Sequence, residues 1–196
     1  MKYSTILKSR PFFFNEEKKV IDLYIGGFNR EEIRDKIIDE DILKFNSKNR
    51  KKEVASTVLK RLDILDEFLL NEFKHSSLAE QKFIVLYTIL KTDRLFFEFM
   101  VEVFREKYLV KDFELKNYDF ESFFREKAIQ SDRIDNWQEY THYKLKQVYI
   151  RILFEAGLIN NQEERQILKP IVAKEIVDHL VLIGDEIYAK ALLGGL

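Results

Sequence analysis

The sequence predicts an all-α protein folded as a compact helical bundle. Glycine and proline are scarce, at 6 and 2 of 196 residues, which favours long helices over all-β folds and glycine-rich loops. Hydrophobic residues make up 46% of the chain and include 17 Phe and 9 Tyr, enough for a sizeable core. Capping boxes, in which a side-chain acceptor is followed three residues later by a carboxylate, are a third sign of helix. They occur at Asn29 with Glu32, Ser77 with Glu80, and Asn161 with Glu164.

Apolar spacing and these caps place the helices in chain order. We expect them over residues 15–26, 30–43, 48–60, 63–74, 78–91, 93–109, 120–128, 142–156, 174–182 and 185–193. The first helix ends at the pair Gly26-Gly27, and Gly157 ends the helix over 142–156, because glycine is the residue that most often follows a helix. Asp119 and Thr141 are further candidate caps.

The helix over 93–109 is expected to be buried along one side. Its apolar residues recur at helical spacing and predict a core stripe. They are Leu95, Phe96, Phe99, Met100, Val103 and Phe104. Thr92 and Asp93 form only a weak break before it, so one continuous helix with residues 78–91 is the alternative.

One stretch, residues 157–172, fits two structures. GLIN (157–160) and ILKPIV (167–172) flank the polar turn NQEERQ, a pattern typical of a small β-hairpin at the end of a winged helix-turn-helix module. The alternative is a loop and a short helix starting at Asn161.

We expect the chain to form two lobes. They are residues 1–75, and residues 76–196 with a winged-helix-like part near 141–172.

Several classes of protein are excluded by composition. The chain has no cysteine, which excludes disulfides, a thiolate zinc site and a cysteine nucleophile. The longest apolar runs fall well short of the about 20 residues that a membrane-spanning helix needs, and the first residues show no secretory signal. We expect a soluble, cytoplasmic protein without a membrane partner.

Positive charge is concentrated at the start of the chain. Residues 1–62 carry 15 basic and 10 acidic side chains, a net +5, although the whole chain carries −1. Residues 42–61 contain one acidic residue, Glu53, against seven basic ones. The basic ones are Lys44, Lys48, Arg50, Lys51, Lys52, Lys60 and Arg61.

The helix expected at residue 48 has one apolar and one polar side. At roughly 100° per residue, the core side consists of Val54, Ala55, Val58, Leu62 and Leu65. The opposite side carries Asn49, Lys52, Ser56 and Lys60, and a flank beside it carries Arg50, Thr57 and Arg61.

This arrangement is the outline of a helix-turn-helix. A capped helix precedes the basic one, and the short turn KFN (44–46) joins them. Lys48, Arg50, Lys51 and Lys52 also lie in the first turn, where positive charge opposes the helix dipole. Candidate DNA-binding residues on this helix are Lys48, Asn49, Arg50, Lys51, Lys52, Ser56, Lys60 and Arg61. We expect them to contact roughly five phosphates. A plain solvated surface and docking of an acidic partner protein are the alternatives.

A second basic stripe follows later. Lys144, Gln147 and Arg151 share one face of the helix over 142–156. The two alternatives for this helix are a second DNA contact and a core helix with one solvent-exposed stripe.

Catalytic and metal-binding patterns are missing from the sequence. His75, His142 and His179 are far apart and lack metal-ligand spacing. There is no phosphate-cradling glycine-rich loop, no GxSxG and no HExxH. We expect no enzymatic activity, no catalytic residue, no cofactor and no metal.

Several stretches, which together cover nearly the full length, resemble the BrxA family of BREX bacteriophage-defence systems. They are YSTILKSRPFFFNEEKKVIDLYIGG, LKRLDILDE with the basic helix before it, KTDRLFFEFMVEVFREKY, YTHYKLKQVYIRILFEAGLI and GDEIYAKALLG. The resemblance implies NusB-like helical packing and a non-enzymatic role in binding double-stranded DNA beside other BREX proteins. A NusB-like relationship keeps RNA as an alternative ligand.

Overall fold

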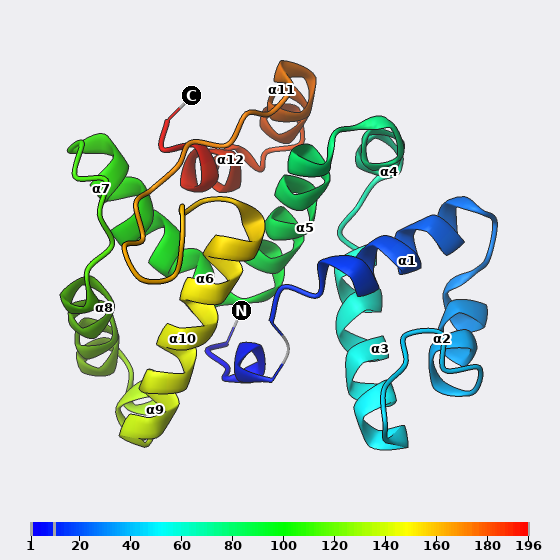
Figure 1. Cartoon of the computed structure of the whole chain (residues 1–196), viewed down its shortest axis with the longest axis horizontal. Coiled ribbons are helices and arrows are strands. Elements are labelled where there is room, and N and C mark those ends of the chain that lie inside the picture. The colour runs from blue at the N-terminus through cyan, green and yellow to red at the C-terminus, as the bar shows by residue number, and fades with distance from the viewer. Residues whose placement is uncertain (1, 10, 196) are drawn as a thin grey trace. The chain divides into compact units, whose positions relative to one another are not determined.

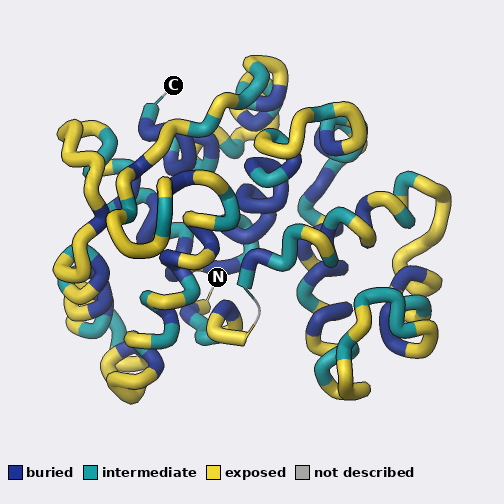
Figure 2. Tube along the Cα trace, in the orientation of Figure 1, coloured by how far each residue is buried: buried dark blue, intermediate teal, exposed yellow. Residues whose placement is uncertain are grey.

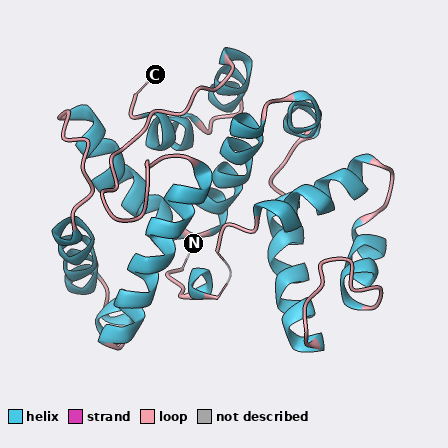
Figure 3. Ribbon diagram, in the orientation of Figure 1, coloured by secondary structure: helices cyan, strands magenta, loops and turns pink. Residues whose placement is uncertain are grey.

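The structure is a computed structural model that describes residues 2–9 and 11–195. Every regular element in these residues is a helix, and they contain no strand (Figure 3), which confirms the all-α prediction. The chain folds into two compact units. The small unit is Phe13–Ser77, and the large unit runs up to Phe12 and again from Leu78 onwards.

The small unit contains the first four α-helices (Figure 1). They are α1 (Phe14–Ile25), α2 (Arg30–Ile38), α3 (Lys48–Leu62) and α4 (Glu67–His75). The predicted capping box at the start of α2 is present: Asn29 Oδ1 accepts from the Glu32 N–H at 3.0 Å, and Glu32 Oε2 accepts from the Asn29 N–H at 2.7 Å.

The connection between α2 and α3 differs from the predicted tight turn. It spans residues 39–47, because α2 ends at Ile38 rather than at residue 43. Three acidic residues, 39–41, follow that end, where the helix dipole disfavours negative charge. Asp41 and Lys44 take left-handed backbone angles, with φ of 54° and 58°, and Asp41 Oδ1 accepts from the Phe45 N–H at 3.0 Å. A helix-turn-helix has a turn of about three or four residues, so this pair of helices departs from it.

The large unit contains the remaining helices (Figure 1). They are η1 (Ile6–Lys8), α5 (Leu78–Thr92), α6 (Arg94–Phe99), η2 (Met100–Arg105), α7 (Glu106–Leu109), α8 (Asn117–Gln130), α9 (Asp132–Asp135), α10 (Glu139–Ala156), α11 (Lys174–Leu182) and α12 (Glu186–Leu193). Helix α5 packs against α6, α10 and α12, and most of its length is buried (Figure 2). It therefore supplies a large part of the core of this unit.

The predicted core stripe of residues 93–109 is largely confirmed. Phe96 and Phe99 are fully buried, and their rings lie 4.7 and 5.3 Å from that of Tyr149 in α10. The break at Thr92-Asp93 separates two helices, because Asp93 Oδ1 accepts from the Phe96 N–H at 2.9 Å and caps α6. Of the stripe, Val103 alone is half-exposed.

Residues 2–9 with Pro11 and Phe12 lie with the large unit rather than with the first predicted lobe. The hydroxyl of Tyr3 donates to Glu98 Oε2 at 2.9 Å, and Lys8 Nζ donates to Thr141 Oγ1 at 3.3 Å. Leu7 and Phe12 are buried, at 3% and 1% exposure. This segment therefore adds apolar side chains to the core of the large unit, and its helix η1 packs against α10.

The predicted hairpin at 157–172 is reduced to isolated antiparallel bridges. Ile159 faces Ile167 across one of them, and the Leu168 N–H donates to the Leu158 carbonyl at 2.8 Å. A second bridge joins residues 114 and 166, so the segment 165–167 is paired on both sides. The alternative helix at Asn161 does not form, since Asn161 Oδ1 holds a local turn by accepting from the N–H groups of residues 163 and 164.

A polar network links several parts of the large unit at Glu98. This carboxylate accepts from the Tyr3 hydroxyl, from Arg94 Nε at 2.6 Å and from Lys127 Nζ at 2.8 Å. Lys127 is almost fully buried and also donates to Glu102 Oε1 at 2.6 Å. Burial alone would raise the pKa of Glu98, but these hydrogen bonds hold it below its usual value of 4.5.

We expect Glu98→Gln to lower the free energy of unfolding by about 2 kcal/mol at neutral pH, because buried Lys127 loses one of its two carboxylates. The folded-state pKa of Glu98 is lowered, so its stabilisation is present above about pH 4.5 and is lost as the pH falls through the folded-state pKa. Urea unfolding followed by circular dichroism measures both effects. The control is Glu106→Gln, an exposed carboxylate. A difference between wild type and Glu98→Gln that stays constant down to about pH 2 would contradict this role.

Candidate nucleic-acid interface on α3

Helix α3 starts at a side-chain cap and buries one side in the small unit. Ser47 Oγ accepts from the Arg50 N–H at 3.2 Å. Val54, Val58 and Leu62 are buried where α3 packs against α1 and α2. The helical wheel therefore predicted its core side correctly.

The opposite side of α3 presents three lysines to solvent. Lys48, Lys52 and Lys60 are exposed, as are Asn49 and Ser56. In the described part of the chain, none of these three lysines forms an ion pair. We call these five residues the α3 lysine face. No acidic residue lies in the first turn to offset the helix dipole, so the positive charge there is uncompensated within that turn.

The two other basic residues at the start of α3, Arg50 and Lys51, form ion pairs with carboxylates. Arg50 Nη1 lies 3.3 Å from Glu53 Oε2, and its guanidinium stands over the rings of Phe13 and Phe45, at 5.6 and 5.7 Å. Lys51 Nζ lies 3.2 Å from Asp41 Oδ1 and is mostly buried. Both side chains thus have structural contacts, and they add less net charge to the surface than the sequence alone indicated.

Arg61 is a correction to the predicted site. It is 2% exposed, and its Nη1 lies 3.2 Å from Oε2 of Glu17, which is fully buried. A guanidinium in this position cannot reach a phosphate or a base edge, so its assignment to the solvent-exposed flank was wrong. The sequence held a signal: Glu17 shares the apolar side of α1 with Val20 and Ile21, and a charge in that register requires a buried partner.

The second predicted stripe, on α10, carries less unpaired positive charge than the sequence indicated. Gln147 and Arg151 are exposed, but Arg151 Nε lies 2.6 Å from Glu155 Oε1. Lys144 is half-buried, and its Nζ lies 5.3 Å from the ring centre of Tyr140. Among the described residues, the stripe therefore presents one ammonium group without a nearby carboxylate partner, compared with three on the α3 lysine face.

The α3 lysine face can bind a polyanion. Ammonium groups displace the counterions that surround phosphates, and the exposed amide of Asn49 and hydroxyl of Ser56 can donate to phosphate oxygens or base edges. Three lysines imply about three phosphate contacts rather than five.

The structure also gives one finding on metal binding and one on membrane insertion. Residues 2–9 and 11–195 include no group of three or more His, Cys, Asp and Glu side chains placed to hold a metal ion. Among the same residues, no helix combines the length and the apolar character needed to cross a bilayer.

Known proteins resemble this chain along its length. The family model of BrxA matches residues 1–183. The BREX protein BrxA of Bacillus cereus (strain H3081.97) is 49% identical over 193 residues, which cover 98% of this chain and 96% of that protein. The crystal structure of an uncharacterized protein from Magnetospirillum magneticum covers 100% of both chains with a TM-score of 0.83 and 18% identity. At that identity, the structural likeness shows the fold alone.

Proposed function

The chain belongs to the BrxA family, and from this membership we propose that it is a non-enzymatic, DNA-binding accessory protein of a BREX phage-defence system. It binds duplex DNA largely through the phosphate backbone, and it works in the cytoplasm beside other BREX proteins. No cofactor or metal takes part.

The observation that carries the proposal is the α3 lysine face. Its three lysines point to solvent without carboxylate partners among the described residues, and one of them, Lys48, lies in the first turn, where it opposes the helix dipole. A helix with only a structural role gains nothing from that placement. The α10 stripe is a weaker second contact in the same proposal, and the NusB-like packing stays a prediction.

Salt dependence of duplex binding tests the proposal. Three phosphate contacts give a slope of about −2.7 in log affinity against log salt, so the affinity should fall about 40-fold between about 50 and 200 mM salt. Fluorescence anisotropy with the purified protein and a labelled duplex measures this slope. The five contacts expected from the sequence would instead give a fall of several hundred-fold.

Two alternatives make different predictions in the same assay. If the α3 lysine face docks an acidic partner subunit, duplex binding by the protein alone is weak and incidental, and it does not depend on Lys48, Lys52 and Lys60. If RNA is the ligand, an RNA hairpin competes with the duplex at much lower concentration than a second duplex does. Either outcome would contradict duplex DNA as the main ligand.

A further inference from the structure

A pocket of about 490 Å³ lies where three distant segments of the large unit meet. Among the described residues, its lining contains cationic and polar side chains and no carboxylate. The lining residues are Lys2, Tyr3, Arg94, Gln130, Ser131 and Arg133. They come from the segment before η1, from the start of α6, and from the end of α8 with α9. All of them belong to one compact unit, so the pocket is a feature of the large unit alone.

The carboxylate of Glu98 connects the same three segments. It accepts from the Tyr3 hydroxyl at 2.9 Å, from Arg94 Nε at 2.6 Å and from Lys127 Nζ at 2.8 Å. The guanidinium of Arg94 also stands over the ring of Tyr3, 4.2 Å from the ring centre. Side chains that are held by such contacts need little further ordering when a ligand binds. The pocket is therefore preorganised on the side that Tyr3 and Arg94 form.

The cations of the pocket are open to solvent, so a ligand can reach them. Lys2 and Arg133 are exposed, and the side chain of Arg94 is 43% exposed. In the part of the chain that the structure describes, neither Lys2 nor Arg133 forms an ion pair. Asp132 is the sequence neighbour of Arg133, but it does not line the pocket. Lys2 and Arg133 therefore bring one uncompensated positive charge each.

Arg94 adds hydrogen-bond donors to the pocket rather than net charge. Its charge and that of Lys127 are balanced by the carboxylates of Glu98 and Glu102, since Lys127 Nζ lies 2.6 Å from Glu102 Oε1 as well. A guanidinium presents several N–H donors in one plane, a geometry that suits the oxygens of a phosphate. The net positive charge of the pocket thus comes from Lys2 and Arg133.

A phosphate monoester matches this lining in charge and in shape. It carries about two negative charges above about pH 7 and has three terminal oxygens, which are strong acceptors. The hydroxyl of Ser131 and the amide of Gln130 are further groups that donate to phosphate oxygens in proteins. A carboxylate or a phosphodiester carries a single charge, so either would leave one of the two uncompensated cations unmatched.

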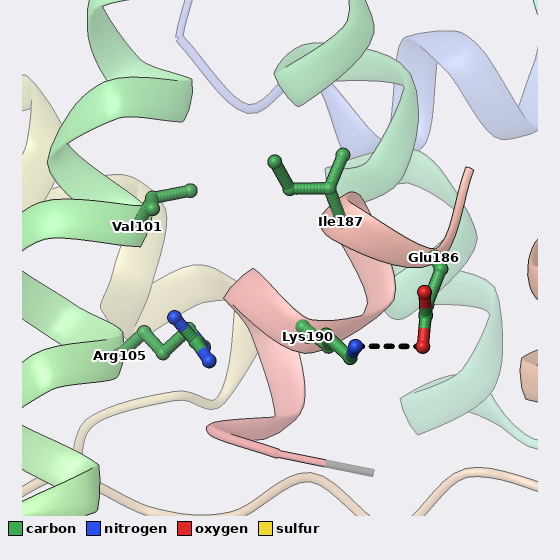
Figure 4. Close-up of a pocket in the computed structure, with 5 residues that line it drawn as sticks. All are labelled: Val101, Arg105, Glu186, Ile187 and Lys190. Carbon is green, nitrogen blue, oxygen red and sulfur yellow. Dashed lines mark ion pairs between the residues drawn. The ribbon is translucent and has the colours of Figure 1, made fainter. Parts of the chain in front are cut away.

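The pocket between the π-helix η2, Met100–Arg105, and α12 has a different charge pattern (Figure 4). Lys190 Nζ lies 2.7 Å from Glu186 Oε1, and Arg105 Nη1 lies 3.8 Å from Glu106 Oε1. Both cations there have a carboxylate close by, so the positive and negative charges offset each other. The contrast shows that uncompensated positive charge is specific to the pocket at Lys2 and Arg133.

We propose that the pocket at Lys2, Arg94 and Arg133 binds the phosphate group of a monoester. Lys2 and Arg133 match its two charges, and Arg94, Ser131 and Gln130 donate to its oxygens. The group has two sources: a small phosphorylated molecule, and the 5′-phosphate at a DNA end, which alone rests on the proposed DNA binding. The site is separate from the α3 lysine face, because all of its residues belong to the large unit.

Isothermal titration calorimetry with two small esters tests the charge match. The probes are phenyl phosphate, a dianion above about pH 7, and phenyl sulfate, which has a similar shape and one charge less. We expect phenyl phosphate to bind at least about tenfold more tightly than phenyl sulfate. In an NMR titration, phenyl phosphate should shift the backbone amide resonances of residues 130–133 at lower concentration than those of α3.

A double variant removes the two uncompensated charges. Lys2→Gln with Arg133→Gln should weaken binding of phenyl phosphate at least about tenfold. Both side chains are exposed, so the fold should survive. The matched control is Lys116→Gln with Lys169→Gln, which removes the same charge from exposed positions of the large unit outside the pocket. The control should bind phenyl phosphate as tightly as the wild type.

Duplexes with and without 5′-phosphates distinguish the two sources of the ligand. If DNA ends supply the phosphate, the phosphorylated duplex binds more tightly than the same duplex with 5′-hydroxyl ends, and the Lys2/Arg133 double variant removes the difference. If a small molecule supplies it, the two duplexes bind alike while phenyl phosphate still binds. Fluorescence anisotropy measures both affinities.

The proposal is overturned if phenyl phosphate at millimolar concentration leaves the amide resonances of residues 130–133 unchanged, or if phenyl sulfate binds equally tightly. It is also overturned if the Lys2/Arg133 double variant binds phenyl phosphate as tightly as the wild type. These three measurements use no DNA, so a failure of the phosphate site leaves the proposed duplex binding intact.

Discussion

Replacing Arg61 by alanine is expected to lower the free energy of unfolding by about 3–5 kcal/mol, enough to unfold many small domains. The reason is Glu17, which is fully buried and whose carboxylate lies 3.2 Å from the Arg61 guanidinium. Without the arginine, a charge that was buried as part of a pair loses that counter-ion. Urea unfolding, followed by circular dichroism, measures the change.

The double variant Glu17→Met with Arg61→Met distinguishes the ion pair from side-chain packing. Replacing both partners by apolar side chains of similar length is often neutral or stabilising, so most of the lost stability should return. Lys60→Met is the control, since Lys60 is adjacent in sequence and exposed. If Arg61→Ala is as stable as Lys60→Met, the buried pair does not exist as described.

Replacing Lys48, Lys52 and Lys60 together by alanine should weaken duplex binding by about two to three orders of magnitude at about 50 mM salt. The salt slope should flatten from about −2.7 toward zero, because the three phosphate contacts are lost. Stability should change little, since all three side chains are exposed and alanine favours helix. Fluorescence anisotropy at several salt concentrations measures both affinity and slope.

A matched triple variant controls for net charge. Lys74, Lys116 and Lys174 are exposed and lie outside α3, so their replacement by alanine removes the same charge but should leave most of the affinity. The double variant Lys144→Ala with Arg151→Ala should have a smaller effect than the α3 triple. If the α3 triple keeps its melting temperature and the wild-type slope, then α3 is not the DNA site, and the α10 stripe or the adaptor role takes its place.

The parts of the fold that were predictable depend on neighbours in sequence. The Asn29 capping box involves residues at most three apart, and the polar side of α3 follows from helical geometry. The end of α2 was missed because it depends on the left-handed conformations at Asp41 and Lys44, which the apolar pattern does not encode. The π-helix η2 was missed for a similar reason, since its apolar spacing resembles that of an α-helix.

The parts of the site that were missed depend on distant partners. Arg61 lies on the flank of the helical wheel, and its burial is decided by Glu17, 44 residues earlier. Lys51 is neutralised by Asp41 only because the loop before α3 brings that carboxylate within 3.2 Å. Sequence patterns on one helix therefore predicted which side faces solvent, but not which of its charges remain without a partner.

The small unit is an insertion in the large one, and this has a consequence for synthesis on the ribosome. Phe13–Ser77 is complete early and can fold as soon as it emerges. Lys8 cannot form its hydrogen bond to Thr141 until that residue, which lies 133 residues further along the chain, has been synthesised. At about 5–20 residues per second, that wait lasts roughly 7 to 27 seconds. During it, Leu7 in η1 lacks α10, the helix against which η1 packs, so the segment before the insertion is the natural place for a chaperone to act.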